Sequence, residues 1–302
     1  GYKIPKPMIF FGVYPKNSSE FPRLKDSLHK ISLNDASISI DTSYSNYLGS
    51  GFRVGFLGLL HAEVVKERLK REEAVDPLFT RPQVLYQKKD DKILEPYMKI
   101  TIYVPKDYMG MLMNLCEKRL GKLLDINYQK ENAILLYEMP YSRLLANLTS
   151  DIKSISSGFA SIDYEITDYK EADLVNLEIL INDTPIDVLS ETVYRDEGRN
   201  IGREKVEKLK ELLPRQQFRQ IIQARLQSPG NEATGGQAKV GGNIIARSEI
   251  PPFRKDVLAK MSGGDRTRKD KLLKKQKKGK ARLFESSRIE IPQTALFSLI
   301  ES

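Results

Sequence analysis

The stretch Tyr97-Met-Lys-Ile-Thr-Ile-Tyr-Val104 decides the fold of its region, because every second residue from Met98 onward is aliphatic or Met. A period of two predicts a strand with one buried face, and Pro105 ends it. The residues after Pro105 change to helical spacing, with apolar positions three or four apart. This strand therefore opens a mixed unit of strands and helices.

The unit that starts at Tyr97 continues for about 70 residues. Its helical stripe ends at Gly121, two strands follow with a polar turn between them, and a helix and a strand close the unit. The order β-α-β-β-α-β is typical of a ferredoxin-like domain. The expected elements are a strand at 97–104, a helical stripe at 109–120, strands at 123–128 and 133–139, a helix at about 141–155 and a strand at 159–166.

The preceding residues repeat this order. Strands are expected at 8–14 and 37–41, with a third from residues 44–54 and a last one at 83–87. The two helices between them are recognised by stripes of apolar residues, namely Phe21, Leu24, Leu28 and Ile31 in the first and Phe56, Leu59, Leu60, Val64 and Leu69 in the second. The predicted class is therefore α+β, with two tandem ferredoxin-like domains at 1–92 and 93–170.

A third domain, a small α+β domain with a basic helix, is expected at 171–302. Alternating apolar residues predict a hairpin of strands at 174–181 and 188–194, and a helix follows at 197–213. Residues 227–242 contain five glycines and a proline, which predicts a mobile loop.

The net charge of +9 is concentrated near the end of the chain. Residues 254–282 hold 13 Lys and Arg against three Asp, a net +10, so the other 273 residues sum to −1. A local block of this kind implies a polyanionic partner.

Within this block we expect a helix at 265–280, with Asp265 as its N-cap and Gly279 at its end. Structured RNA is the preferred ligand, because the block lacks aromatic rings that stack on single-stranded bases. Gly263-Gly264 would let phosphate approach the backbone. The candidate RNA-binding residues are Lys260, Gly263, Gly264, Arg266, Arg268, Lys269, Lys271, Lys274, Lys275, Lys277, Lys278, Lys280 and Arg282.

Three alternatives compete with RNA binding. The block can be a solvated tail, or an interaction module that binds anionic membrane, although its helix lacks a Trp/Phe/Leu face. The third is an enzyme that binds a nucleotide at the glycine-rich segment 49–55, whose spacing is one residue off a dinucleotide fingerprint.

Catalytic motifs are otherwise missing from the sequence. Gly-Lys occurs at Gly121 and Gly279 without the Ser or Thr of a P-loop, and Asp107-Tyr-Met-Gly110 begins a helical stripe. Cys116, the one cysteine, is expected to be a core thiol, and the two histidines, His29 and His61, to be surface or hydrogen-bonded residues. We therefore expect no catalytic site, no metal and no cofactor in this chain.

Four segments resemble a known family. Gly55-Phe-Leu-Gly-Leu-Leu-His-Ala-Glu63, Glu95-Pro-Tyr-Met98 and Ser157-Gly-Phe-Ala-Ser-Ile-Asp-Tyr-Glu165 resemble the post-barrel domains of translational GTPases related to elongation factor G. Ala259-Lys-Met-Ser-Gly-Gly-Asp-Arg-Thr-Arg-Lys-Asp-Lys-Leu-Leu-Lys-Lys-Gln-Lys-Lys-Gly279 is similar to the C-terminal signature of the LepA (elongation factor 4) family, which usually has Cys-Tyr in place of Met261-Ser262.

The resemblance implies a ribosome- and tRNA-binding portion of a fidelity factor that moves tRNAs back by one codon. It implies that the GTPase domain, with its GTP and Mg, would precede Gly1. It places RNA contacts on Lys260, Gly263, Gly264, Asp265, Arg268, Lys269, Lys271, Lys274 and Lys278. The expected protein is a monomer in the bacterial cytoplasm, with peripheral membrane association as an alternative, or in an organellar matrix in a eukaryote.

Overall fold

The structure is a computed structural model that describes residues 7–89, 92–227, 243–253, 266–286 and 291–301. The described residues up to 173, apart from 45–49, form one compact unit, and residues 45–49 with those from 174 onward form a second. The first unit contains two five-stranded antiparallel sheets and the second unit contains one. The predicted α+β class is confirmed, and the division into three domains stays a prediction.

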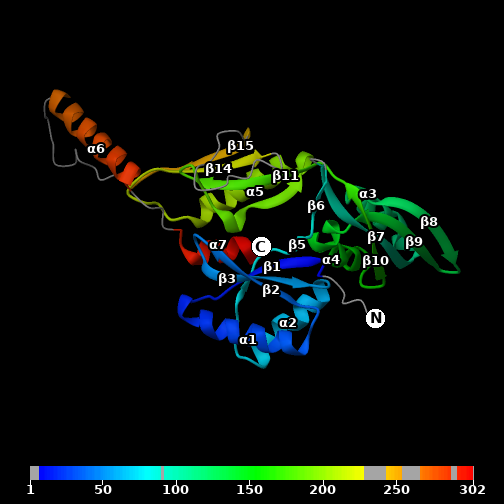
Figure 1. Ribbon diagram of the computed structural model, residues 1–302. Coiled ribbons are helices and arrows are strands. Elements are labelled where there is room, and N and C mark those ends of the chain that lie inside the picture. Colours follow the sequence, from blue (N-terminus) through cyan, green and yellow to red (C-terminus); the bar gives the residue numbers. More distant parts are fainter. Residues whose placement is uncertain (1–6, 90–91, 228–242, 254–265, 287–290, 302) are drawn as a thin grey trace. The chain divides into compact units, whose positions relative to one another are not determined.

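The first sheet of the first unit has the strand order β2-β3-β1, with β4 and β5 both paired to β1. Helices α1 and α2 lie together on one side of this sheet (Figure 1). The predicted order is therefore confirmed, although only residues 83 and 84 of the strand expected at 83–87 form a strand of this sheet, and a further short strand lies at Leu78–Phe79. The elements are β1 (Ile9–Tyr14), α1 (Phe21–Asn34), β2 (Ser39–Ser45), β3 (Gly49–Phe56), α2 (Leu59–Arg71), β4 (Leu78–Phe79) and β5 (Gln83–Val84).

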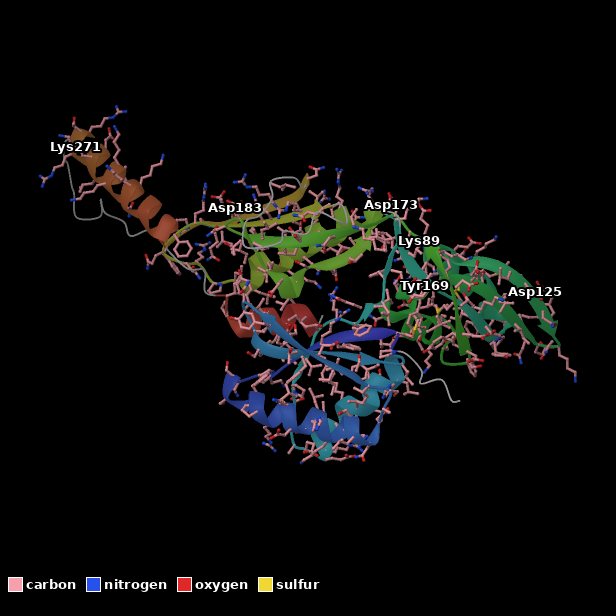
Figure 2. The ribbon with its side chains drawn as sticks, viewed as in Figure 1. Lys89, Asp125, Tyr169, Asp173, Asp183 and Lys271 are labelled. Carbon is pink, nitrogen blue, oxygen red and sulfur yellow. The ribbon has the colours of Figure 1, made fainter. Side chains whose placement is uncertain are left out.

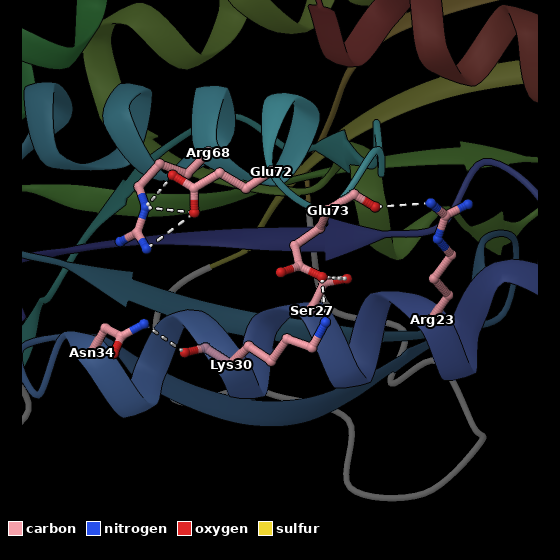
Figure 3. Close-up of polar contacts among 7 residues, drawn as sticks. All are labelled: Arg23, Ser27, Lys30, Asn34, Arg68, Glu72 and Glu73. Atoms are coloured by element: carbon pink, nitrogen blue, oxygen red, sulfur yellow. Dashed lines mark hydrogen bonds and ion pairs between the residues drawn. The ribbon is translucent and has the colours of Figure 1, made fainter.

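Polar contacts fix the end of α2 to α1 (Figure 3). The Glu73 carboxylate accepts hydrogen bonds from Lys30 Nζ at 2.8 Å and Ser27 Oγ at 3.5 Å, and the Glu73 carbonyl oxygen accepts one from Arg23 Nη2 at 2.8 Å. These contacts set the position at which the chain turns from α2 back to the sheet.

The apolar stripe predicted for α2 is partly wrong. The helix begins at Leu59 and buries Ala62, Val65 and Leu69, whereas Leu60 and Val64 are 73% and 49% exposed. Phe56 is buried too, but as the last residue of β3. The buried residues Ala62, Val65 and Leu69 recur at a spacing of three and four, so they share one side of the helix, and Leu60 and Val64 lie on another.

The second sheet has the order β10-β7-β9-β8, with β6 added to β7. Met98, Ile100, Ile102 and Val104 of β7 are at most 1% exposed, which confirms the buried face predicted from their alternation. The elements are β6 (Gln87–Lys89), β7 (Lys92–Pro105), α3 (Lys106–Lys118), β8 (Lys122–Gln129), β9 (Asn132–Pro140), a π-helical turn (Leu144–Leu148), α4 (Thr149–Ile155) and β10 (Ser161–Glu171).

Both strand orders are the ferredoxin-like order of fourth, first, third and second strand, so each β-α-β-β-α-β repeat closes its own sheet. The last strand of the second repeat begins at Ser161, two residues later than predicted. Phe159 therefore belongs to the loop between α4 and β10 and not to the strand.

The second unit has the sheet order β12-β11-β14-β15, with β13 also paired to β11. The predicted hairpin and helix are confirmed as β11, β13 and α5, whereas β14, β15 and α7 were not predicted. The elements are β11 (Leu174–Ile181), β12 (Thr184–Pro185), β13 (Glu191–Tyr194), α5 (Arg195–Leu212), β14 (Gln220–Gln227), β15 (Asn243–Ile250), α6 (Arg266–Ser286) and α7 (Gln293–Glu301).

Two glycines let α5 approach this sheet closely. A Cβ on Gly198 would lie 2.9 Å from Leu226 Cδ2, and one on Gly202 would lie 2.6 Å from Ile245 Cδ1. Gln227, the first residue of the loop predicted at 227–242, is the last residue of β14, and the rest of that predicted loop, 228–242, lies outside the described residues.

Candidate nucleic-acid interface

The basic block contains one long helix, α6, from Arg266 to Ser286. At about 1.5 Å per residue, its 21 residues extend roughly 30 Å. From Arg266 to Gly279 the helix carries eight Lys and Arg residues against the single acid Asp270, a net +7. This is the densest positive charge that the structure describes.

The cationic side chains of α6 point into solvent on several sides. Lys269, Leu272 and Gln276, spaced three and four residues apart, are half-buried, and the other described side chains of the helix are exposed. Leu273 is 44% exposed. Figure 2 shows the side chains of α6, Lys271 among them, spreading outward around the helix. The described side chains of the helix, from Arg266 to Gly279, form no broad apolar face with which to join a core.

Like charges face one another along α6. Lys271 and Lys275, and Lys274 and Lys278, are four residues apart, and positions with this spacing are neighbours on a helix surface. Each such pair destabilises an isolated helix by roughly 0.2 to 0.5 kcal/mol. An array of phosphates would relieve this repulsion and release counterions.

The structure places seven of the candidate lysines and arginines on the exposed part of α6 and Lys269 on its half-buried stripe. Lys280 and Arg282 also belong to α6, but the positions of their side chains are not described. Lys260, Gly263, Gly264 and Asp265 lie outside the described residues. The seven exposed candidates are Arg266, Arg268, Lys271, Lys274, Lys275, Lys277 and Lys278.

The predicted end of the helix at Gly279 is wrong. The helix continues through Gly279 to Ser286. Glycine ends a helix when it adopts a left-handed conformation, and Gly279 is not among the residues with positive φ. Lys278, Lys280 and Ala281 around it are strong helix formers, so the helix continues.

The glycine-rich segment does not form a nucleotide loop. Gly51 and Gly55 lie inside strand β3, where each lets a neighbouring side chain approach. A Cβ on Gly51 would lie 2.4 Å from Tyr14 Cδ1, and one on Gly55 would lie 2.4 Å from Ser39 Oγ. A dinucleotide fingerprint needs its glycines at a strand-to-helix turn, so these glycines serve sheet packing.

The other candidate reactive residues have structural roles. Cys116 is fully buried on α3, and burial raises the pKa of its thiol to about 12. His61 Nδ1 accepts the Leu57 N–H at 3.2 Å, so Nε2 carries the proton and donates to Asp35 Oδ2 at 2.9 Å. Both predictions for these residues are confirmed. Within the described ranges, no cluster of three or more His, Cys, Asp or Glu could hold a metal ion.

The described helices include none that is long and apolar enough to cross a membrane.

Two family models match consecutive parts of the chain. Residues 92–180 match the model for the elongation factor G C-terminus. Residues 181–229 and 235–301 match the model for the GTP-binding protein LepA C-terminus, which covers α6.

Curated relatives align with the whole chain. The chain is 40% identical over 322 aligned positions to elongation factor 4 of Synechococcus elongatus and to that of Microcystis aeruginosa, and each alignment covers 100% of this chain and 51% of the relative. Elongation factor 4 of Hydrogenobaculum sp. is 41% identical over 325 positions, with 100% and 52% coverage. The chain thus spans about half the length of the curated relatives it matches, and it belongs to the LepA (elongation factor 4) family of translation elongation factors.

Proposed function

We propose that this chain is the ribosome- and tRNA-binding portion of its factor, and that α6 binds RNA phosphates. The observation that carries the proposal is the run of eight Lys and Arg residues against one acid between Arg266 and Gly279, a part of the helix whose described side chains form no broad apolar face. The family membership supports a ribosomal partner.

In this proposal the two ferredoxin-like repeats are rigid arms that transmit the state of the GTPase domain. GTP hydrolysis belongs to a domain outside this chain, and its energy supports the movement of tRNAs back by one codon. Lys260, Gly263, Gly264, Lys280 and Arg282 would extend the contact with RNA beyond the described side chains of α6.

Structured RNA fits the described part of α6 better than a membrane does. An interfacial helix inserts a continuous apolar face into the lipid boundary. Between Arg266 and Gly279 the apolar residues are Leu272, which is half-buried, and Leu273. Two adjacent leucines do not make such a face, whereas the lysines match a surface of phosphates.

The test is charge reversal on α6. Changing Lys271, Lys274, Lys275, Lys277 and Lys278 to Glu should abolish co-sedimentation with bacterial ribosomes at moderate salt. Unchanged binding by this variant would overturn the proposal, and wild-type binding to anionic vesicles in preference to ribosomes would favour the membrane module.

A matched control separates local charge from total charge. Five exposed lysines elsewhere, Lys25, Lys70, Lys118, Lys122 and Lys208, can be changed to Glu instead. Each variant changes the net charge by −10, from +9 to −1. If RNA binds α6, the control should keep most of its ribosome affinity.

A further inference from the structure

The loop between α4 and β10 holds an aromatic ring in solvent. Phe159 is 68% exposed, although a ring of this size is usually buried. It stacks on Tyr108 of α3, with ring centroids 6.3 Å apart and an interplanar angle of 22°. Tyr108 in turn packs against the core of the first unit. One ring is therefore anchored, and the second is held on top of it.

The backbone fixes this loop tightly. All five N–H groups from Ser156 to Ala160 donate hydrogen bonds, among them Gly158 to the Lys153 carbonyl oxygen at 2.7 Å and Ala160 to Ser156 Oγ at 3.1 Å. Ser157 and Gly158 have φ values of 52° and 84°. A serine in the left-handed conformation costs free energy. The loop contains such a serine, and yet it leaves the apolar ring of Phe159 outside the core. Core packing does not account for this arrangement.

Further aromatic and cationic side chains lie at the same end of the second sheet. Lys106, directly after β7, lies over the Tyr128 ring at 5.9 Å, and Tyr128 is 57% exposed. Phe159 precedes β10 and Tyr128 is near the end of β8, the two outer strands of the four-stranded order. With strands about 4.8 Å apart, the row from Phe159 through Tyr108 and Lys106 to Tyr128 spans roughly 14 Å. We call this row the aromatic rim.

We propose that the aromatic rim binds ribosomal RNA, with an unpaired base stacking on the Phe159 ring. This inference rests on the proposed function and adds a second RNA contact, on a different unit from α6. Base stacking on an exposed aromatic ring, with lysines beside it for the backbone, is the common way in which proteins hold unpaired nucleotides.

Charge and space around Phe159 favour RNA over a protein partner. Residues 152–162 contain one base, Lys153, and no acid; of the two acids that flank them, Asp163 lies within β10 and Asp151 is paired with Arg119 Nη2 at 2.7 Å. Ser157 and Gly158, directly before the ring, are small and leave room for a ribose and its phosphate. The ring presents a flat face above Tyr108, which suits a base.

The test compares side chains of similar size with and without a π system. In the full chain, Phe159→Ala and Phe159→Leu should each weaken binding to bacterial ribosomes roughly 5- to 150-fold, whereas Phe159→Tyr and Phe159→Trp should stay within about 2-fold of wild type. The loss should be similar at low and high salt, because stacking is not a charge effect.

The Phe159→Leu variant distinguishes base stacking on the ring from a simple apolar contact. If Phe159→Leu binds as wild type does, the rim makes an apolar contact with a protein, or none, and this proposal is overturned. Wild-type binding that depends on α6 but not on Phe159 leaves the proposed function intact. Failure of the wild-type chain to bind ribosomes overturns both.

Chemical probing of the ribosomal RNA gives an independent readout. The wild-type chain should protect at least one base that Phe159→Ala leaves reactive, at concentrations that saturate both proteins. Thermal unfolding of Phe159→Ala should match wild type, since the ring is two-thirds exposed. Identical protection patterns would overturn the stacking contact.

Discussion

The ring of Tyr14 on β1 lies directly against Gly51 on β3. A Cβ on Gly51 would stand 2.4 Å from Tyr14 Cδ1 and 2.8 Å from the Val13 carbonyl oxygen, and the latter cannot rotate away. Gly51→Ala should therefore lower the free energy of unfolding by roughly 1 to 3 kcal/mol through overpacking. Thermal or denaturant unfolding of the purified chain measures this change.

Gly110 provides the matched control for that substitution. It is an exposed residue within α3 and has no atom within 4 Å of an added Cβ. Gly110→Ala should stabilise the first unit by about 0.5 to 1 kcal/mol, because alanine loses less backbone entropy in a helix. Equal effects of the two substitutions would contradict the packing role of Gly51.

Glu95 should make stability depend on pH. It is fully buried, and burial raises its carboxyl pKa from 4.5 to about 7, although the Ser142 hydroxyl donates to it at 3.1 Å and Arg143 lies nearby. The folded state therefore binds this proton more tightly than the unfolded state, so the stabilisation is present at low pH and is lost as pH rises from about 4.5 through 7.

The substitution Glu95→Gln tests this dependence, because glutamine has the same shape and no charge. Its stability relative to wild type should rise by an amount of order 2 to 4 kcal/mol between pH 5 and pH 8. Denaturant midpoints measured across that range give the difference, and a constant offset between the two proteins would contradict the buried, titrating carboxyl.

Cys116 should be unreactive in the folded protein. Its side chain is fully buried and its thiol pKa is raised to about 12. The fraction of Cys116 that is both ionised and accessible to a reagent is therefore negligible at pH 8. A thiol reagent should modify the native chain only at the rate of unfolding, and rapidly in guanidinium. Because the chain has one cysteine, the reagent reports on this site alone. Fast modification of the native protein would show that α3 opens locally.

The salt dependence of RNA binding should identify which lysines of α6 contact phosphate. Each lysine that neutralises a phosphate contributes about 0.7 to 0.9 to the slope of log affinity against log salt concentration. Lys274→Gln and Lys278→Gln should each reduce the slope by about that amount, whereas Lys118→Gln on α3 should leave it unchanged. Titrations between 50 and 200 mM salt are sufficient for the comparison, and slopes that respond equally to all three changes would argue against a local interface.

The ferredoxin-like repeats could be predicted because their strands have one buried face. In β7, alternation from Met98 to Val104 fixes both the strand and the side that packs, and Pro105 marks its end. The unpredicted strands β14 and β15 have weaker patterns. Ile221 and Ile222 of β14 are adjacent apolar residues, and the pairing of β14 with β15 shifts register between Ala224 and Arg225, so a period of two is interrupted.

Of the two candidate RNA-binding sites, α6 could be predicted from the sequence and the aromatic rim could not. The charge of α6 depends on consecutive residues, so the helix and its lysines can be predicted from the sequence alone. The aromatic rim depends on the strand order β10-β7-β9-β8, which brings residues 106, 128 and 159 to one end of a sheet. The sequence predicts a strand from residue 159, which includes Phe159. Only the hydrogen bonds of the loop show that it lies outside that strand.

The long, cationic α6 has a consequence for the kinetics of encounter. Because its lysines already project from a formed helix, contact with RNA requires little backbone ordering, and a concentrated positive end orients the chain while it diffuses toward a polyanion. Such steering accelerates association much more than it prolongs the bound state. The lifetime of the complex would then depend on uncharged contacts elsewhere. One part of the chain would set the association rate and another the dissociation rate.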